Sequence, residues 1–76
     1  MHPEVTINPY EVTFRTRHSI GSDLVRIRFS DGRPLVTVAR EIDGHLMPVP
    51  LTIPLEDLLQ YVAEAERIQE ESGEPP

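Results

Sequence analysis

Apolar and polar residues alternate along the first two thirds of the chain, which is typical of strands that bury one face. Three dipeptides interrupt this alternation, namely Gly21-Ser22, Asp31-Gly32 and Asp43-Gly44. Each is favoured in two-residue hairpin loops, because these residues tolerate the positive φ that such turns require. The pattern therefore predicts four antiparallel strands, connected as a meander that begins near residue 10.

Two-residue loops at these dipeptides fix a register that the apolar positions can test. The three predicted loops agree in placing one large set of apolar residues on a single face of the predicted sheet, and a slip of one residue in any loop would break this agreement. The face contains Tyr10, Val12, Phe14, Val25, Ile27, Phe29, Val36, Val38, Met47, Val49, Leu51 and Ile53. The apolar pairs predicted across the three hairpins are Phe14 with Phe29, Ile27 with Val36, and Val38 with Val49. Pro48 and Pro50 cannot donate hydrogen bonds to a ladder, so we expect the fourth strand at an edge.

Beyond residue 53 the apolar period becomes helical. Pro54 suits the first turn of a helix, and Glu56 and Asp57 directly after it complement the positive end of the helix dipole. The predicted fold is therefore α+β, a four-stranded antiparallel β-meander followed by one C-terminal helix. We expect residues 1–9 to form an N-terminal extension, residues 10–69 the domain, and residues 70–76 a flexible acidic tail.

The apolar stripe of the predicted helix spans about half its circumference, more than one small sheet needs. Its surplus edge is a candidate homodimer interface, formed by Leu58, Tyr61, Ala65 and Ile68. Self-association would reinforce a chain of 76 residues that has no cysteine for a disulfide. The alternative is a helix seated deep in its own sheet.

Catalytic and metal-binding motifs are missing from the sequence. It contains no cysteine or lysine nucleophile, no G-x-S-x-G motif and no phosphate-binding loop. The three histidines, at positions 2, 18 and 45, are too widely spaced to suggest a zinc site. We expect His18 to lie at the rim of the apolar face with its hydrogen-bonding atoms satisfied, and Arg40 to reach a carboxylate of the helix. We therefore expect a binding protein and not an enzyme, with no metal and no cofactor.

The apolar runs are too short for a membrane span, and the first residues lack the apolar region of a signal peptide. These features favour a cytoplasmic protein. The net charge of −6 argues against a general polyanion binder. Charge is nevertheless polarised, since residues 1–42 hold six arginines against five acids and residues 43–76 hold one arginine against eight acids.

One cluster of charge does suggest a binding surface. The predicted first hairpin sets four arginines opposite one another on the outer face, Arg15 with Arg28 and Arg17 with Arg26. Like charges paired across strands destabilise a sheet, so this square needs a reason. It could bind phosphates or an acidic protein segment, with Arg33 near the second turn also contributing. Alternatively, Glu11 and Glu41 on the same face, or an acidic partner helix, could neutralise it.

The remainder of the predicted outer face is apolar. Leu24, Leu35, Ala39 and Leu46 should be exposed there, beside the arginines. Apolar patches rimmed by charge often mark interaction sites. This combination would suit a nucleic-acid strand or a peptide.

A family resemblance covers roughly residues 10–70. It is carried by Val25–Gly32, Leu35–Glu41, Gly44–Pro48 and Ile53–Leu55. In these segments and in element order the chain resembles the positive cofactor four type of transcriptional coactivator. The resemblance implies a homodimer that binds single-stranded DNA across exposed sheet faces, at Arg15, Arg17, Arg26, Arg28 and Arg33. The chain departs from that family before the helix, where it has Pro48–Leu51 in place of basic residues, and its predicted outer face offers no aromatic side chain for base stacking.

Two functions therefore remain open. One is a dimeric module that binds single-stranded nucleic acid and acts in transcription regulation. The other is a protein-interaction module, such as a small regulator or inhibitor encoded by a phage, which binds another protein and not nucleic acid. The net charge favours the second, while the arginines and the resemblance favour the first.

Overall fold

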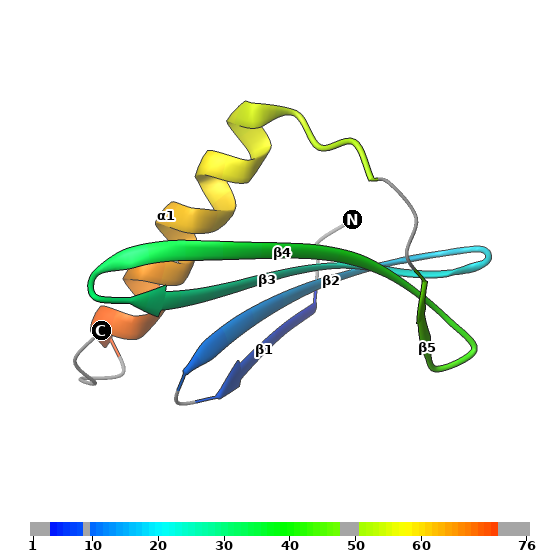
Figure 1. Cartoon of the computed structure of the whole chain (residues 1–76), viewed down its shortest axis with the longest axis horizontal. Coiled ribbons are helices and arrows are strands. Elements are labelled where there is room, and N and C mark those ends of the chain that lie inside the picture. The colour runs from blue at the N-terminus through cyan, green and yellow to red at the C-terminus, as the bar shows by residue number, and fades with distance from the viewer. Residues whose placement is uncertain (1–3, 9, 48–50, 72–76) are drawn as a thin grey trace.

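The fold is an antiparallel sheet with a single helix on one face. The structure is a computed structural model that describes residues 4–8, 10–47 and 51–71. Five strands pair in chain order, and the helix follows them (Figure 1). The strands are β1 (Glu4–Asn8), β2 (Glu11–His18), β3 (Gly21–Ser30), β4 (Arg33–Ile42) and β5 (His45–Met47), and the helix is α1 (Leu55–Glu71). The α+β class and the antiparallel meander are confirmed.

The number of strands differs from the prediction of four. Residues 4–8, predicted as part of an N-terminal extension, form β1 and pair with β2, with Thr6 opposite Thr13. The fourth predicted strand is shorter than expected, because Leu51 and Ile53 lie outside any strand. Pro48, Val49 and Pro50 lie outside the described residues. The helix continues to residue 71, so it enters the segment predicted as an acidic tail.

The second and third hairpins have the predicted turns. Both residues of each turn have positive φ, 53° and 76° at Asp31 and Gly32, and 52° and 80° at Asp43 and Gly44. Positive φ at both central positions defines a type I′ turn, the geometry that Asp-Gly favours. The pairing of Ile27 with Val36 is confirmed.

The prediction for the first hairpin was wrong. The structure pairs His18 with Gly21, so the loop is Ser19-Ile20 and Phe14 lies opposite Val25 in place of Phe29. Gly21 is the first residue of β3, and its backbone runs close to β4. A Cβ atom at this position would lie 2.1 Å from the backbone oxygen of Glu41. The glycine is therefore needed for a close approach between strands, and not for a turn.

The core lies between α1 and the strands β2 and β3. It consists of Val12 and Phe14 of β2, Val25 and Ile27 of β3, and Ala65 of α1. The rings of Phe14 and Tyr61 lie with their centroids 4.9 Å apart. The predicted apolar face therefore exists, and its buried centre comes from β2 and β3.

The helix edge predicted as a dimer interface packs inside the chain. Ala65 is fully buried in the core, and the other three residues pack against it, namely Leu58, Tyr61 and Ile68. The contacts of these four residues favour the alternative, a helix that packs them against its own sheet, although Leu58, Tyr61 and Ile68 are only partly buried. A homodimer stays a prediction.

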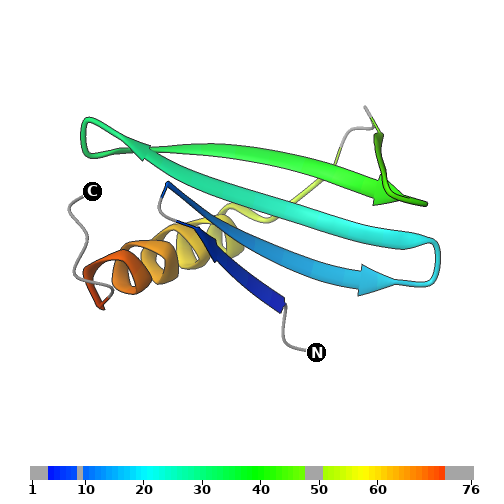
Figure 2. The same ribbon diagram turned by 90° about the horizontal axis from the view of Figure 1, so that it is seen from below.

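The helix begins after Pro54, whose carbonyl accepts hydrogen bonds from the N–H groups of Asp57 and Leu58 at 3.0 and 3.1 Å. Figure 2 shows α1 on one side of the sheet, running obliquely to the strands. Because it covers β2 and β3, Val36 and Val38 on the same face of β4 stay exposed. The opposite face of the sheet, here called the outer face, carries no helix among the described residues.

Candidate functional site on the outer face of the sheet

All five arginines predicted as binding residues lie on the outer face. The strand pairings place Arg15 and Arg17 on β2, Arg26 and Arg28 on β3, and Arg33 at the start of β4. The predicted square does not form, since the corrected register separates its pairs. Arg15 lies opposite Leu24, Arg17 opposite Ser22, Arg26 opposite Thr13 and Arg28 opposite Glu11. The arginines therefore avoid the like-charge pairs that would destabilise the hairpin.

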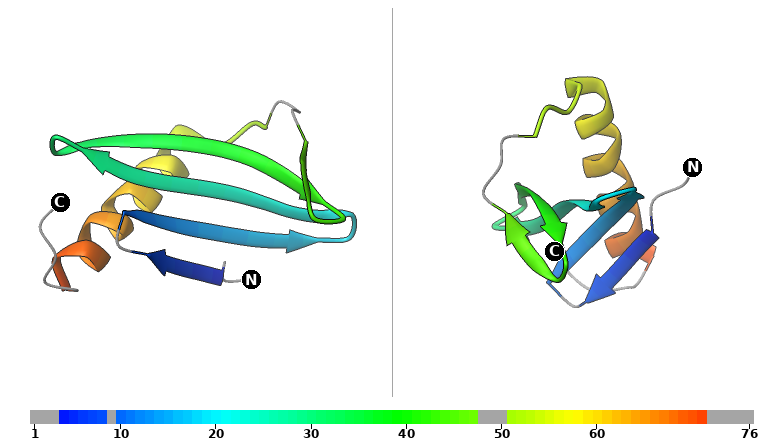
Figure 3. Two further views of the ribbon diagram at one scale, coloured as in Figure 1. Left: turned by 60° about the horizontal axis from the view of Figure 1, so that its bottom comes forward. Right: turned by 90° about the vertical axis from the view of Figure 1, so that its right-hand side faces the viewer.

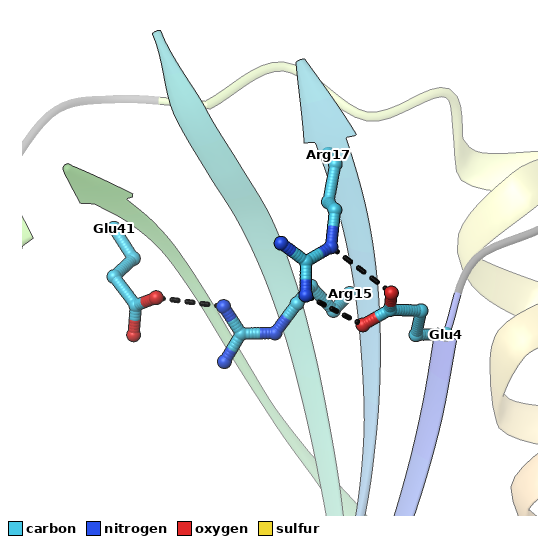
Figure 4. Close-up of polar contacts among 4 residues, drawn as sticks. All are labelled: Glu4, Arg15, Arg17 and Glu41. Carbon is cyan, nitrogen blue, oxygen red and sulfur yellow. Dashed lines mark hydrogen bonds and ion pairs between the residues drawn. The ribbon is translucent and has the colours of Figure 1, made fainter. Parts of the chain in front are cut away.

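Arg15 forms an ion pair that crosses β3. Its Nη1 donates to Oε1 of Glu41 on β4 at 2.6 Å (Figure 4). The residues of β3 that pair with these two strands here are Leu24, opposite Arg15, and Ser22, opposite Glu41. Both are buried, with 1% and 6% of their surfaces exposed. The ion pair thus lies over β3 and shields Leu24, which the sequence had predicted to be exposed.

Arg17 is also neutralised within the chain. Its Nε and Nη2 donate to the two carboxylate oxygens of Glu4 on β1 at 3.0 and 3.2 Å (Figure 4). This two-pronged bond lowers the pKa of Glu4 below its usual value. The chain's own carboxylates therefore neutralise two of the five arginines, as one of the alternatives predicted. Glu41 was among the predicted carboxylates, whereas Glu4 was not.

The other three arginines form no ion pair with the described residues. We call Arg26, Arg28 and Arg33 the basic strip, because they follow β3 and its turn into β4 on the outer face. Glu11 lies directly opposite Arg28, but it accepts a hydrogen bond from Thr13 at 3.3 Å. Alternate residues of a strand lie about 7 Å apart. Arg26 and Arg28 therefore lie close together along β3, and Arg33 lies opposite Ser30 at the start of β4.

Charge separates the two sides of the domain. The described outer face holds five arginines against Glu4, Glu11 and Glu41. The helix holds six acidic residues against one arginine, Arg67, which pairs with Glu64 and Glu71. A chain with net charge −6 therefore carries a surface that is locally basic. Such a field can attract an anionic ligand to one side of a protein.

The helix side holds a separate polar cluster at the far end of the sheet. Oδ1 of Asp23 lies 3.0 Å from Nε2 of His18 and accepts a hydrogen bond from Nε of Arg40 at 2.8 Å. Arg40 had been expected to reach a carboxylate of the helix, and it pairs with β3 instead. The hydrogen bond from the Arg40 guanidinium holds the pKa of the Asp23 carboxyl below its usual value, and the contact with His18 lowers this pKa further by a smaller amount.

This cluster predicts a loss of stability in acid. A carboxyl group with a lowered folded-state pKa stabilises the fold above its unfolded pKa, near 3.9, and loses that effect as the pH falls through the folded value. Asp23→Asn should cost less than about 1 kcal/mol at pH 7, because the pair is partly exposed. The cost should shrink as the pH falls below the unfolded pKa, about 3.9, and through the lowered folded value. Urea unfolding of both proteins from pH 2 to 7 measures it, and a cost that stays constant across this range would contradict the assignment.

In the part of the chain that the structure describes, no group of three histidine, cysteine or acidic side chains is arranged to hold a metal ion. Over the same residues, no helix is both long enough and apolar enough to cross a membrane. Comparisons of the chain with protein-family models, curated proteins and solved structures find no match.

Sequence reasoning placed the five arginines on the correct face but assigned their neighbours wrongly. It missed the role of Glu4, which depends on β1, and the burial of Leu24, which depends on the corrected register. A signal for β1 was present, since Val5 and Ile7 alternate with polar residues directly before Pro9-Tyr10.

Proposed function

We propose that the chain is a binding module whose outer sheet face takes single-stranded nucleic acid, most simply single-stranded DNA. The observation that carries this proposal is the basic strip, whose three arginines have no ion-pair partner among the described residues. Arginine suits this task, because its planar group donates to phosphate oxygens in pairs. The resemblance to positive cofactor four type coactivators supports the same proposal and extends it to a role in transcription regulation.

The corrected register divides the arginines by role. Arg26 is flanked across the sheet by Thr13 and Thr37, so no acidic side chain competes for it there. Arg15 and Arg17 already hold carboxylates. The first group should supply the binding energy, and the second should mainly hold the sheet together.

The test is a salt-dependent binding assay with single-stranded oligonucleotides. Each phosphate neutralised on a single strand contributes about 0.7 to the slope of log K against log salt. Arg26→Ala/Arg28→Ala should therefore weaken binding and lower the slope by about 1.4. Arg40→Ala/Arg67→Ala makes the same change in net charge away from the outer face, and it should leave the slope unchanged.

A third variant tests the carboxylate opposite Arg28. Glu11→Gln removes the nearest acidic competitor on the outer face and should strengthen binding. A wild-type protein that binds no oligonucleotide at about 10 mM salt, where the Debye length reaches about 30 Å, would exclude the nucleic-acid proposal.

A second candidate function is binding to another protein. Leu35 and Leu46 are exposed on the outer face, beside the arginines. An apolar patch rimmed by positive charge suits an acidic amphipathic segment. If oligonucleotides fail to bind, Arg26→Ala/Arg28→Ala is the variant with which to test for the loss of such a partner.

A further inference from the structure

The free edge of β1 has the properties of an interface. β1 pairs with β2 on one side only, and no described strand lies beyond it. Figure 3 shows β1 at the rim of the sheet, with β2 on one side of it and no strand on the other. An edge strand presents unpaired N–H and C=O groups, and proteins usually protect it with lysine, proline or a bulge. Residues 4–8 contain neither lysine nor proline.

The side chains of β1 also lack cover. Val5 and Ile7 lie on the helix side of the sheet, yet 44% and 55% of their surfaces are exposed. Both apolar residues of this five-residue strand are therefore left about half exposed to water. A strand added at this edge would cover them and satisfy the open backbone groups.

We propose that this edge pairs with the β1 edge of a second copy, as two antiparallel strands related by a two-fold axis at Thr6. This register sets Thr6 opposite the partner's Thr6, Val5 opposite the partner's Ile7, and Glu4 opposite the partner's Asn8. It is self-complementary, because apolar residues meet apolar ones, hydroxyls meet hydroxyls, and no like charges face each other.

The symmetry of the register supports a second copy over an unrelated strand. Backbone groups of alternate residues point to the same edge of an antiparallel strand. A two-fold axis at Thr6 matches residues whose backbone groups share that direction, and it pairs all five residues of β1. The two sheets then join into one, with both outer faces on the same side. This dimer does not depend on what the outer face binds.

A disulfide tests the register directly. Residues directly opposite in an antiparallel pair have Cα atoms about 4.5–5.5 Å apart, within the range that a disulfide spans. The chain has no cysteine of its own, so Thr6→Cys should cross-link two copies at that single position. Thr13→Cys is the matched control, because Thr13 is the neighbour of Thr6 on β2. In the dimer its two copies would lie three strand spacings apart, about 14 Å, which is too far for a disulfide.

At micromolar protein, Thr6→Cys should oxidise to a covalent dimer about 100-fold faster than Thr13→Cys, because pairing raises the effective concentration of the thiols to millimolar. Wild-type sedimentation over a concentration series should show dimers. Equal oxidation rates for the two cysteine variants would overturn the proposal. So would a wild type that stays monomeric at about 0.1 mM, because a dimer with a dissociation constant well above micromolar would still be detected at that concentration.

Charge exchange gives an independent test that needs no oxidation. Val5→Lys/Ile7→Lys opposes lysines across the two-fold axis and should abolish the dimer, as should Val5→Glu/Ile7→Glu. Mixing these two variants should restore a dimer that contains one copy of each. Val36→Lys/Val38→Lys makes the same change on the same face of the sheet but on β4, which β2 and β3 separate from β1, and it should leave the dimer intact. A dimer that survives in Val5→Lys/Ile7→Lys would show that the interface lies elsewhere.

Discussion

Leu24→Ala should lower the free energy of unfolding by about 2–5 kcal/mol, the range for a buried leucine truncated to alanine. The expected loss is large because only 1% of Leu24 is exposed, although it lies on the face that no helix covers. A domain of 76 residues has a total stability of about 4–11 kcal/mol. Chemical denaturation should therefore find the variant close to the limit of folding at room temperature.

Leu35→Ala is the matched control for this prediction. Leu35 lies on the same outer face, one strand away on β4, and 43% of it is exposed. The same substitution there should cost well under 1 kcal/mol, as is usual for surface positions. If the two variants lost equal stability, the Arg15–Glu41 ion pair would not be shielding a second small core.

The burial of Leu24 could not be predicted from the local sequence pattern. Strict alternation assigned it to the solvent side, and that assignment to the outer face is correct. We attribute its burial to Arg15 on β2 and Glu41 on β4, which meet at 2.6 Å across β3. Long charged side chains can bury apolar surface with their stems while their heads stay hydrated. Such cover depends on the register of three strands at once.

The turns show where local chemistry is sufficient. Asp31-Gly32 and Asp43-Gly44 form the predicted type I′ turns, because only residues that tolerate positive φ fit both central positions. The geometry of each turn is set by its two central residues and needs no tertiary contact. The registers of the second and third hairpins follow from these turns, and they were correct where the structure describes them.

The first hairpin shows where local chemistry misleads. The predicted and observed registers differ by four residues, since Phe14 faces Val25 and not Phe29. An even shift keeps every side chain on the same face of the sheet. The apolar face was therefore predicted correctly, while the neighbours of the arginines across β2 and β3 were not. The pattern of polarity alone could not detect this error, and the predicted arginine square was its result.

The reason for this error is that a glycine can serve two purposes. Gly21 was taken as a turn residue because Gly-Ser suits a two-residue loop. In the structure it lies in β3, where the backbone oxygen of Glu41 occupies the space of a Cβ atom. The same substitution at two glycines can separate these purposes. Asparagine is suitable, because it is among the few residues that adopt positive φ routinely.

Gly21→Asn should therefore be among the most destabilising surface-accessible changes in the chain. Its Cβ would lie 2.1 Å from a backbone atom that cannot rotate away, so the strands β3 and β4 must separate locally. Forcing extra atoms into such a contact typically costs about 1–3 kcal/mol, and sometimes more. The free energy of unfolding from urea titrations measures this cost.

Gly32→Asn is the matched control. Gly32 has a φ of 76°, and no atom lies within 4 Å of the position of its Cβ. Asparagine should be tolerated there with a loss below about 1 kcal/mol, because type I′ turns accept it. The first register, with Gly21 in a turn, predicts instead that both substitutions are mild. A small effect at position 21 would therefore restore that register and the arginine square with it, whereas a large effect confined to position 21 supports the pairing of His18 with Gly21.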